Sequence, residues 1–154
     1  MQKAKLSLIA AALLVPAFAL SAYAADFVRP MPTHPIQAGP TLLGGEQPVI
    51  CSPLVGKNLK AIKAEAKTVK ALNPDMVEVR ADYWDFIEDT DKAIEALQAI
   101  RNIIGDTPIL LTVRVAEERG FKKVGQKPKF DFYKKAAALK LPNLIDVELV
   151  YGAD

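Results

Sequence analysis

DMVEVRADYW, residues 75–84, is an apolar stretch that carries an acid and a base two positions apart. Side chains alternate between the two faces of a strand, so Glu78 and Arg80 share one face. The opposite face carries only apolar residues, namely Val77, Val79 and Ala81. This pattern predicts a strand that buries one face in a hydrophobic core and presents charge on the other.

Strands and helices are predicted to alternate on both sides of this stretch. Strand-like apolar runs occupy residues 48–56, 107–115 and 143–152. Amphipathic helices are predicted over residues 57–73, 89–106 and 129–141. Strand–helix repeats with short connections indicate parallel strands joined by right-handed crossovers. The sequence therefore predicts an α/β fold, which is either an open doubly wound sheet or part of a (β/α) barrel.

The helical spacing predicts which side chains reach the core. The first helix presents a stripe made of Leu59, Ile62, Ala66, Val69 and Leu72. The stripe of the second helix consists of Ile94, Leu97, Ile100 and Ile104. Asp89 or Thr90 is expected to cap the start of that helix, and Gly105 to end it. Pro53 places a break near the end of the first strand.

The composition is that of a single globular domain. The chain has 154 residues, of which 51% are hydrophobic and 25% are charged, and its net charge is +2. That charge is too small to favour binding of nucleic acid. The lysines are spread along helices, which predicts a solvated face rather than a basic patch. The single cysteine, Cys51, cannot form a disulfide within the chain, and its place in an apolar run predicts a buried, inert thiol.

The first residues have the features of an export signal. An apolar run over residues 6–20 follows two lysines and precedes the small-x-small pattern of residues 22–24. This predicts a secretory signal peptide over residues 1–24, cut after Ala24, and a periplasmic or secreted product that no longer contacts a membrane. An uncleaved membrane anchor is the alternative. Residues 25–47 are rich in proline and glycine, and we expect an arm without a helix before the domain at 48–154.

Charge recurs at the ends of the later strands. Arg114 lies at the end of the third strand with Thr112 on its face, and Asp146 and Glu148 share a face of the fourth strand. The carboxyl ends of parallel strands meet at one edge of a sheet or barrel, which is where ligands bind. We therefore expect these charges and those of the second strand to gather at one site.

Two interpretations of these charges stay open. One is a structural ion network that pairs Arg80 with Glu78 and Arg114 with Glu148. The other is a site in which arginine forks bind a small anion and the acids bind its hydroxyl groups. No phosphate loop or metal-ligand spacing is present, and His34 is the only histidine, so neither a metal nor a cofactor is expected.

Four segments resemble the type I 3-dehydroquinate dehydratases, which are (β/α)8 barrel enzymes of the shikimate pathway. The segments are LGGEQPVICSPLVGKN (43–58), LNPDMVEVRADYW (72–84), DTPILLTVRVAEERG (106–120) and LIDVELVYGAD (144–154). The resemblance implies that residues 48–154 form the N-terminal half of a TIM-type (β/α)8 barrel. It also implies a lyase that dehydrates 3-dehydroquinate to 3-dehydroshikimate through a lysine Schiff base, with a histidine as proton carrier and no cofactor.

The resemblance assigns roles to four residues. Glu78, Arg80 and Arg114 would contact the substrate, and Glu118 would support the catalytic histidine. Two departures from the family pattern are Val79, where an aromatic residue is usual, and Arg119-Gly120, where Gly-Gly is usual. The family's histidine and lysine lie on later strands of the barrel. His34 matches neither of them, and Lys122 and Lys123 are the nearest lysines to the expected site.

The resemblance therefore implies that this chain binds substrate without the catalytic pair, and we expect it to show no dehydratase activity by itself. A continued barrel would supply the missing residues, and export would suit quinate catabolism outside the cytoplasm. The alternative is a non-catalytic half-barrel that binds a small hydroxy-acid anion, with two copies packed as a homodimer. An unrelated open α/β sheet is the third interpretation.

Overall fold

The computed structural model describes residues 31–149. The predicted signal peptide lies outside the described residues, as do the start of the predicted arm and the end of the predicted fourth strand. Within the described part, four parallel strands form one sheet and two short strands form a hairpin. No helix among residues 31–149 has both the length and the apolar character needed to cross a bilayer.

The four parallel strands follow one another in space in the same order as in the chain. They are β3 (Cys51–Leu54), β4 (Met76–Arg80), β5 (Ile109–Thr112) and β6 (Leu144–Asp146). A doubly wound sheet reverses its strand order at a switch point, whereas a barrel adds each new strand on the same side. The prediction of barrel-type (β/α) units is confirmed, and the doubly wound alternative is wrong.

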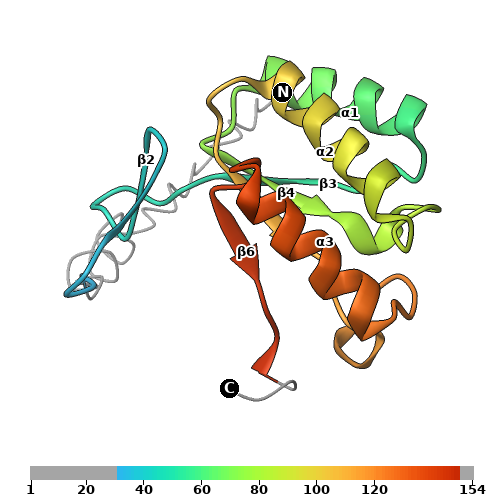
Figure 1. The fold of residues 1–154 in the computed structure, drawn as a ribbon. Helices are drawn as coiled ribbons and strands as arrows, with labels where there is room; N and C mark the ends of the chain where they lie inside the picture. The colour runs from blue at the N-terminus through green and yellow to red at the C-terminus, as the bar shows by residue number, and fades with distance from the viewer. Residues whose placement is uncertain (1–30, 150–154) are drawn as a thin grey trace, which may run out of the picture. The chain divides into compact units, whose positions relative to one another are not determined.

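Three helices pack against one face of this sheet (Figure 1). They are α1 (Leu59–Leu72), α2 (Thr90–Ile104) and α3 (Gln126–Ala138), and two short 3₁₀ helices, η1 (Ala81–Tyr83) and η2 (Ala116–Glu118), follow β4 and β5. Asn58 caps α1, and Asp89 caps α2 as predicted, because its side chain accepts a hydrogen bond from the backbone N–H of Lys92. The opposite face of the sheet is left without a helix in the described chain.

The core lies between the sheet and the helices. The apolar face of the 75–84 stretch is fully buried there, as the alternation predicts; its members are Val77, Val79 and Ala81. Helix residues that pack with them include Ile62, Ala66, Leu97, Ile100, Ile104 and Phe132. Trp84, the single tryptophan, is also buried and contacts Phe86 and Phe132. Local periodicity therefore identifies the buried face correctly.

Two side chains are wrongly placed in the core by sequence. Leu72 is 72% exposed, because each residue turns an α-helix by about 100° and position 72 has drifted about 120° around the helix from Ala66. Cys51 is exposed, because β3 is an edge strand with β4 as its neighbour in the described sheet. Partial burial, and then the negative charge of Glu78, raise the pKa of the Cys51 thiol and favour its protonated form.

Several element boundaries also differ from the prediction. The second strand ends at Arg80, where η1 turns the chain. The third helix begins at Gln126 rather than at residue 129, because Pro128 falls in the first turn, where a proline costs no hydrogen bond. The fourth strand ends at Asp146, beyond which Val147 and Leu149 are exposed rather than packed against a helix.

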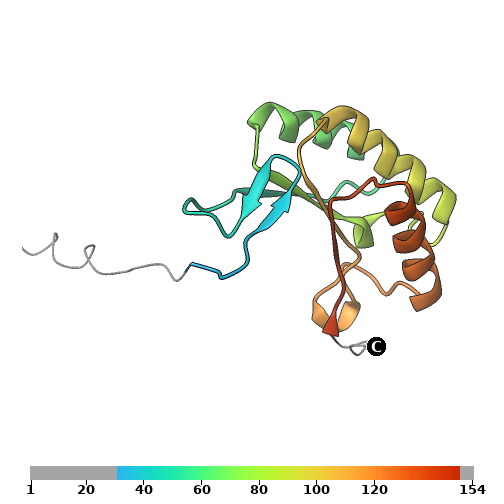
Figure 2. The ribbon, with the colours of Figure 1, turned by 60° about the vertical axis from the view of Figure 1, so that its left-hand side comes forward.

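Part of the predicted arm is ordered as a hairpin (Figure 2). Strands β1 (Ile36–Ala38) and β2 (Thr41–Leu43) pair in antiparallel register around Gly39, which has a positive φ of 54°. The Thr41 hydroxyl donates to the backbone carbonyl of Asp75 at 2.7 Å, just before β4 begins. The arm is therefore not irregular throughout, although its described part contains no helix, as predicted.

Candidate functional site

The strand register brings the sequence-predicted polar residues to one face of the sheet. Arg80 of β4 lies beside Thr112 of β5, and Thr112 lies beside Asp146 of β6. Glu78 lies two residues before Arg80 in β4 and points to the same face, since side chains two apart on a strand point the same way. The face is the one that the helices leave uncovered (Figure 1). Polar side chains from three neighbouring strands therefore lie side by side on one face of the sheet, as expected from sequence.

Arg80 is held by Asp82 and not by Glu78. Its Nε and Nη2 atoms donate to the two carboxylate oxygens of Asp82, each at 2.9 Å, in a bidentate pair. The guanidinium also lies over the ring of Tyr83, 5.3 Å from its centroid. The predicted Arg80–Glu78 pair is wrong, because both residues point straight out of an extended strand while the η1 turn folds Asp82 back toward the guanidinium.

Asp82 joins two segments that are distant in the sequence. Its buried carboxylate accepts the Arg80 pair and also a hydrogen bond from the backbone N–H of Phe121 at 2.8 Å. Burial raises the pKa of Asp82, but the hydrogen bonds from Arg80 and Phe121 outweigh burial and hold the pKa below its usual value. Sequence reasoning gave Asp82 no role, although the Glu-x-Arg-x-Asp spacing contains it.

Arg114 lies among three carboxylates. Its side chain donates to Asp146 at 2.5 Å and to Glu118 at 3.1 Å, and it lies 3.8 Å from Glu148. The predicted proximity of Arg114 and Glu148 is therefore present, but Asp146 and Glu118 are the closer partners. Glu118 comes from η2 and is half exposed, so the loop after β5 contributes an acid to the same face.

A buried ion pair lies behind this cluster. Lys129 of α3 donates to Glu148, and both side chains are almost completely buried. Glu148 also accepts the backbone N–H of Val115 at 3.0 Å. Burial raises the pKa of Glu148, but the Lys129 ammonium and the backbone N–H bonds outweigh burial and hold it below its usual value.

Lys129 is a residue that sequence reasoning missed, because the helical lysines were expected to be solvated. A signal was present in the spacing. Lys129 stands three, four and seven residues before the buried face of α3, whose members are Phe132, Tyr133 and Ala136. A lysine on an apolar helix face needs a buried carboxylate as partner, and Glu148 supplies it.

Acid is expected to weaken the fold through Asp82 and Glu148. Both carboxyls have lowered pKa values when folded, so below about pH 4 the unfolded chain binds more protons than the folded chain. Their stabilisation is complete at neutral pH and is lost as the pH falls through the folded-state pKa values. Urea unfolding at pH 7, 4 and 3 measures this. The isosteric variant Asp82→Asn should lose less stability between pH 7 and pH 3 than wild type, and identical acid profiles would contradict the argument.

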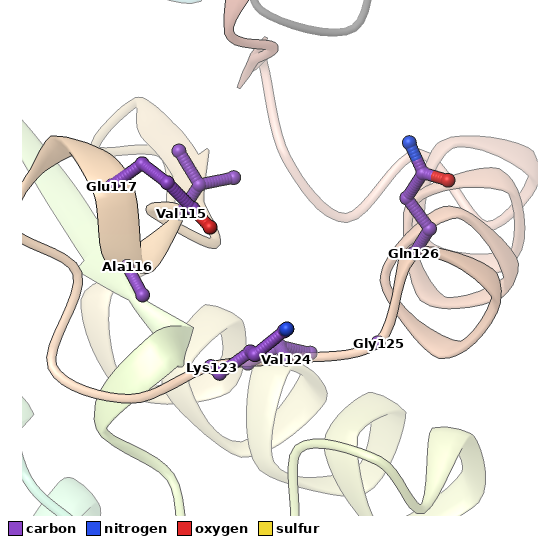
Figure 3. A pocket seen from close by; sticks show the side chains of 7 residues that line it. All are labelled: Val115, Ala116, Glu117, Lys123, Val124, Gly125 and Gln126. Atoms are coloured by element: carbon purple, nitrogen blue, oxygen red, sulfur yellow. The ribbon is translucent and has the colours of Figure 1, made fainter.

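A separate hollow of about 400 Å³ lies between η2 and the start of α3. Figure 3 shows Val115, Ala116 and Glu117 on one side of it and Gln126 on the opposite side, with Lys123 and Val124 between them. Its lining is mainly apolar and includes none of the four residues that the resemblance assigned. The charged sheet face is therefore the better candidate for binding a polar ligand.

The remaining sequence candidates lie away from the charged face or are already engaged. His34 contacts the hydroxyl of Thr33 in an exposed segment before β1. Lys122 donates to the backbone carbonyl of Trp84, which holds its ammonium at the η1 turn. Across residues 31–149, no group of three or more His, Cys, Asp or Glu side chains is arranged to hold a metal ion.

Comparison with known proteins gives one consistent result. A family model described as type I 3-dehydroquinase matches residues 50–154. A 3-dehydroquinate dehydratase from a Geobacillus species is 38% identical over 112 residues, which are 72% of this chain and 43% of that protein. One from Bacillus licheniformis is 39% identical over 107 residues, which are 70% of this chain and 42% of that protein.

Solved structures give the same result. The 3-dehydroquinate dehydratase of Geobacillus kaustophilus matches with a TM-score of 0.75 and 30% identity, over 79% of this chain and 48% of that one. A type I enzyme from Clostridium difficile with covalently modified comenic acid matches with a TM-score of 0.74 and 34% identity, over 77% and 47%. The chain therefore spans less than half the length of each of these relatives.

Proposed function

The chain belongs to the type I 3-dehydroquinase family, and from this we propose that its open sheet face is the substrate-binding half of a 3-dehydroquinate dehydratase site. The whole protein would be a hydro-lyase of the shikimate pathway, acting on 3-dehydroquinate and releasing 3-dehydroshikimate and water. The observation that carries the proposal is the convergence of two arginine side chains and several acids on one accessible face at the carboxyl ends of the strands.

The substrate's chemistry fits this face. 3-Dehydroquinate carries a carboxylate, a ketone and hydroxyl groups. A guanidinium has five N–H donors, and Arg80 uses two of them on Asp82, which leaves donors for a ligand carboxylate or hydroxyl. Glu78 carries carboxylate oxygens on the same face, and carboxylates accept hydrogen bonds from hydroxyl groups. Substrate positioning of this kind lowers the entropy cost of the reaction.

Asp82 keeps the Arg80 fork in place for this role. A bidentate pair fixes the plane of a guanidinium, and the buried carboxylate of Asp82 cannot swing away without losing the Phe121 N–H bond as well. Arg114 is held in a different way, by partly exposed acids that a ligand carboxylate can displace. Arg80 would therefore offer a fixed guanidinium to the ligand, whereas Arg114 would exchange an acid partner for the ligand carboxylate.

Loss of water from the substrate requires removal of a proton next to the ketone and departure of a hydroxyl group. In the proposed function a lysine forms a Schiff base at the ketone and a histidine moves the protons, both from barrel strands later than β6. Glu118 would orient that histidine, since a carboxylate that accepts the second ring N–H fixes the imidazole. The described residues would bind and orient the substrate, so we expect a protein limited to residues 1–154 to bind 3-dehydroquinate without turnover.

Replacing Arg114 is expected to weaken ligand binding strongly. Loss of charge-assisted hydrogen bonds should raise the Kd for 3-dehydroquinate by about 10- to 100-fold in Arg114→Met, measured by isothermal titration. Arg114→Lys keeps the positive charge but lacks the planar guanidinium, so its Kd should lie between those of wild type and Arg114→Met.

The matched control is Lys127→Met, which removes one positive charge from the exposed surface of α3. It should leave the Kd unchanged. An Arg114→Met protein that is folded and binds like wild type would contradict a role for this face in binding substrate.

A further inference from the structure

One buried polar atom on the charged face has no hydrogen-bond partner. Among the buried side-chain nitrogen and oxygen atoms of residues 31–149, this atom is the hydroxyl oxygen of Thr112. The two residues beside Thr112 in the strand register are both paired, Arg80 with Asp82 and Asp146 with Arg114. An unpartnered buried hydroxyl is unfavourable, whereas an apolar side chain of similar shape, such as valine, does not carry that desolvation cost. The orphan hydroxyl therefore needs an explanation.

The position of Thr112 supplies one. Parallel pairing places it on β5 between Arg80 of β4 and Asp146 of β6, with all three side chains on the open face. Arg114 lies two residues beyond Thr112, just after β5 ends, and donates to Asp146. Thr112 thus lies between the charged residues of β4 and β6.

We propose that the Thr112 hydroxyl is a further substrate-binding group of this site, and that an oxygen atom of the bound hydroxy-acid completes its hydrogen bonding. This inference rests on the proposed function and adds a residue to it. The side chains on either side of Thr112 are partly exposed, with Arg80 at 20% and Asp146 at 26%. A ligand carboxylate that draws Arg114 away from Asp146 brings the ligand to this part of the face, where the hydroxyl donates to it or accepts from it.

The test compares a threonine whose hydroxyl is partnered with the one whose hydroxyl is not. The Thr107 hydroxyl donates to the backbone carbonyl of Ile104 at 3.2 Å, so it is partnered in the free protein, whereas the Thr112 hydroxyl is not. Each is replaced by valine, and Tm and the Kd for 3-dehydroquinate are measured. Thr112→Val should keep or raise Tm and raise the Kd about three- to ten-fold, and Thr107→Val should lower Tm and leave the Kd unchanged. Thr112→Ser, which retains the hydroxyl, should bind within about two-fold of wild type.

The other outcomes separate this inference from the function beneath it. An unchanged Kd in Thr112→Val, with Arg114→Lys still weakened, overturns the inference and leaves the proposed function standing. A lower Tm in Thr112→Val with an unchanged Kd does the same, because it assigns the hydroxyl a structural partner. If wild type itself does not bind 3-dehydroquinate, the proposed function fails and the inference fails with it.

Discussion

Replacing Lys129 by methionine is expected to lower the free energy of unfolding by about 3–5 kcal/mol. Methionine fills the space of the lysine stem but leaves the buried carboxylate of Glu148 without its ammonium partner. Two groups then remain near that charge: the backbone N–H of Val115, which donates to it, and the guanidinium of Arg114 at 3.8 Å. Urea unfolding followed by the fluorescence of buried Trp84 measures the loss.

Two variants make the Lys129 result specific. Lys127→Met changes a lysine on the same helix that is 85% exposed, and it should cost less than about 0.5 kcal/mol. The double variant Lys129→Met/Glu148→Gln removes both charges while the glutamine carbonyl still accepts from Val115, so it should recover most of the lost stability. A double variant no more stable than Lys129→Met would show that the lysine acts through packing and not through its charge.

Replacing Gly120 by alanine is expected to destabilise the loop after β5 by about 1–3 kcal/mol or more. A Cβ atom at this position would stand 2.2 Å from the carbonyl oxygen of Arg114 and 2.7 Å from that of Val115. Both obstacles are backbone, so the loop itself must move. Because Phe121 follows directly and donates to Asp82, the displacement should also loosen Arg80 and weaken the proposed binding of 3-dehydroquinate.

The neighbouring residue gives the matched control. Arg119 has φ 65° and ψ 30°, the left-handed conformation that glycine adopts without strain. Arg119→Gly should therefore keep the free energy of unfolding unchanged or raise it by up to about 1 kcal/mol. This explains how the chain tolerates Arg119-Gly120 where the family pattern has Gly-Gly, since only the second glycine is required by space. Equal stability of Gly120→Ala and Arg119→Gly, measured by urea unfolding, would contradict that distinction.

The charged side chains of the site are oriented by residues from other segments of the chain. The sequence places one charged residue after another at the strand ends, but the side chains are oriented by partners from other segments. Asp82 orients Arg80, and the loop after β5 reaches Asp82 through Phe121. Lys129 neutralises Glu148 from the helix side, so Glu148 does not compete at full strength with Asp146 and Glu118 for Arg114. Residues outside the open face, among them Asp82 and Lys129, thus set the orientation and charge of the side chains on it.

The sequence by itself determined the features that depend on local spacing. Alternation in the 75–84 stretch separates Val77 and Val79 from Glu78 and Arg80, because a strand turns each successive side chain to the opposite face. The same reasoning located the Asp89 cap and the parallel strand–helix order. The signal peptide and export also rest on local sequence, and they stay predictions because residues 1–24 lie outside the described structure.

Only the tertiary structure decided which charges pair and which side chains are exposed. The η1 turn brings Asp82 within hydrogen-bonding distance of Arg80. The packing of α3 buries Lys129 against Glu148, and the edge position of β3 leaves Cys51 exposed. The register of three strands left the Thr112 hydroxyl without a partner between Arg80 and Asp146. Periodicity fixes the face on which a side chain lies, but hydrogen bonds form only within about 3.5 Å, and the folding of distant segments sets which groups come that close.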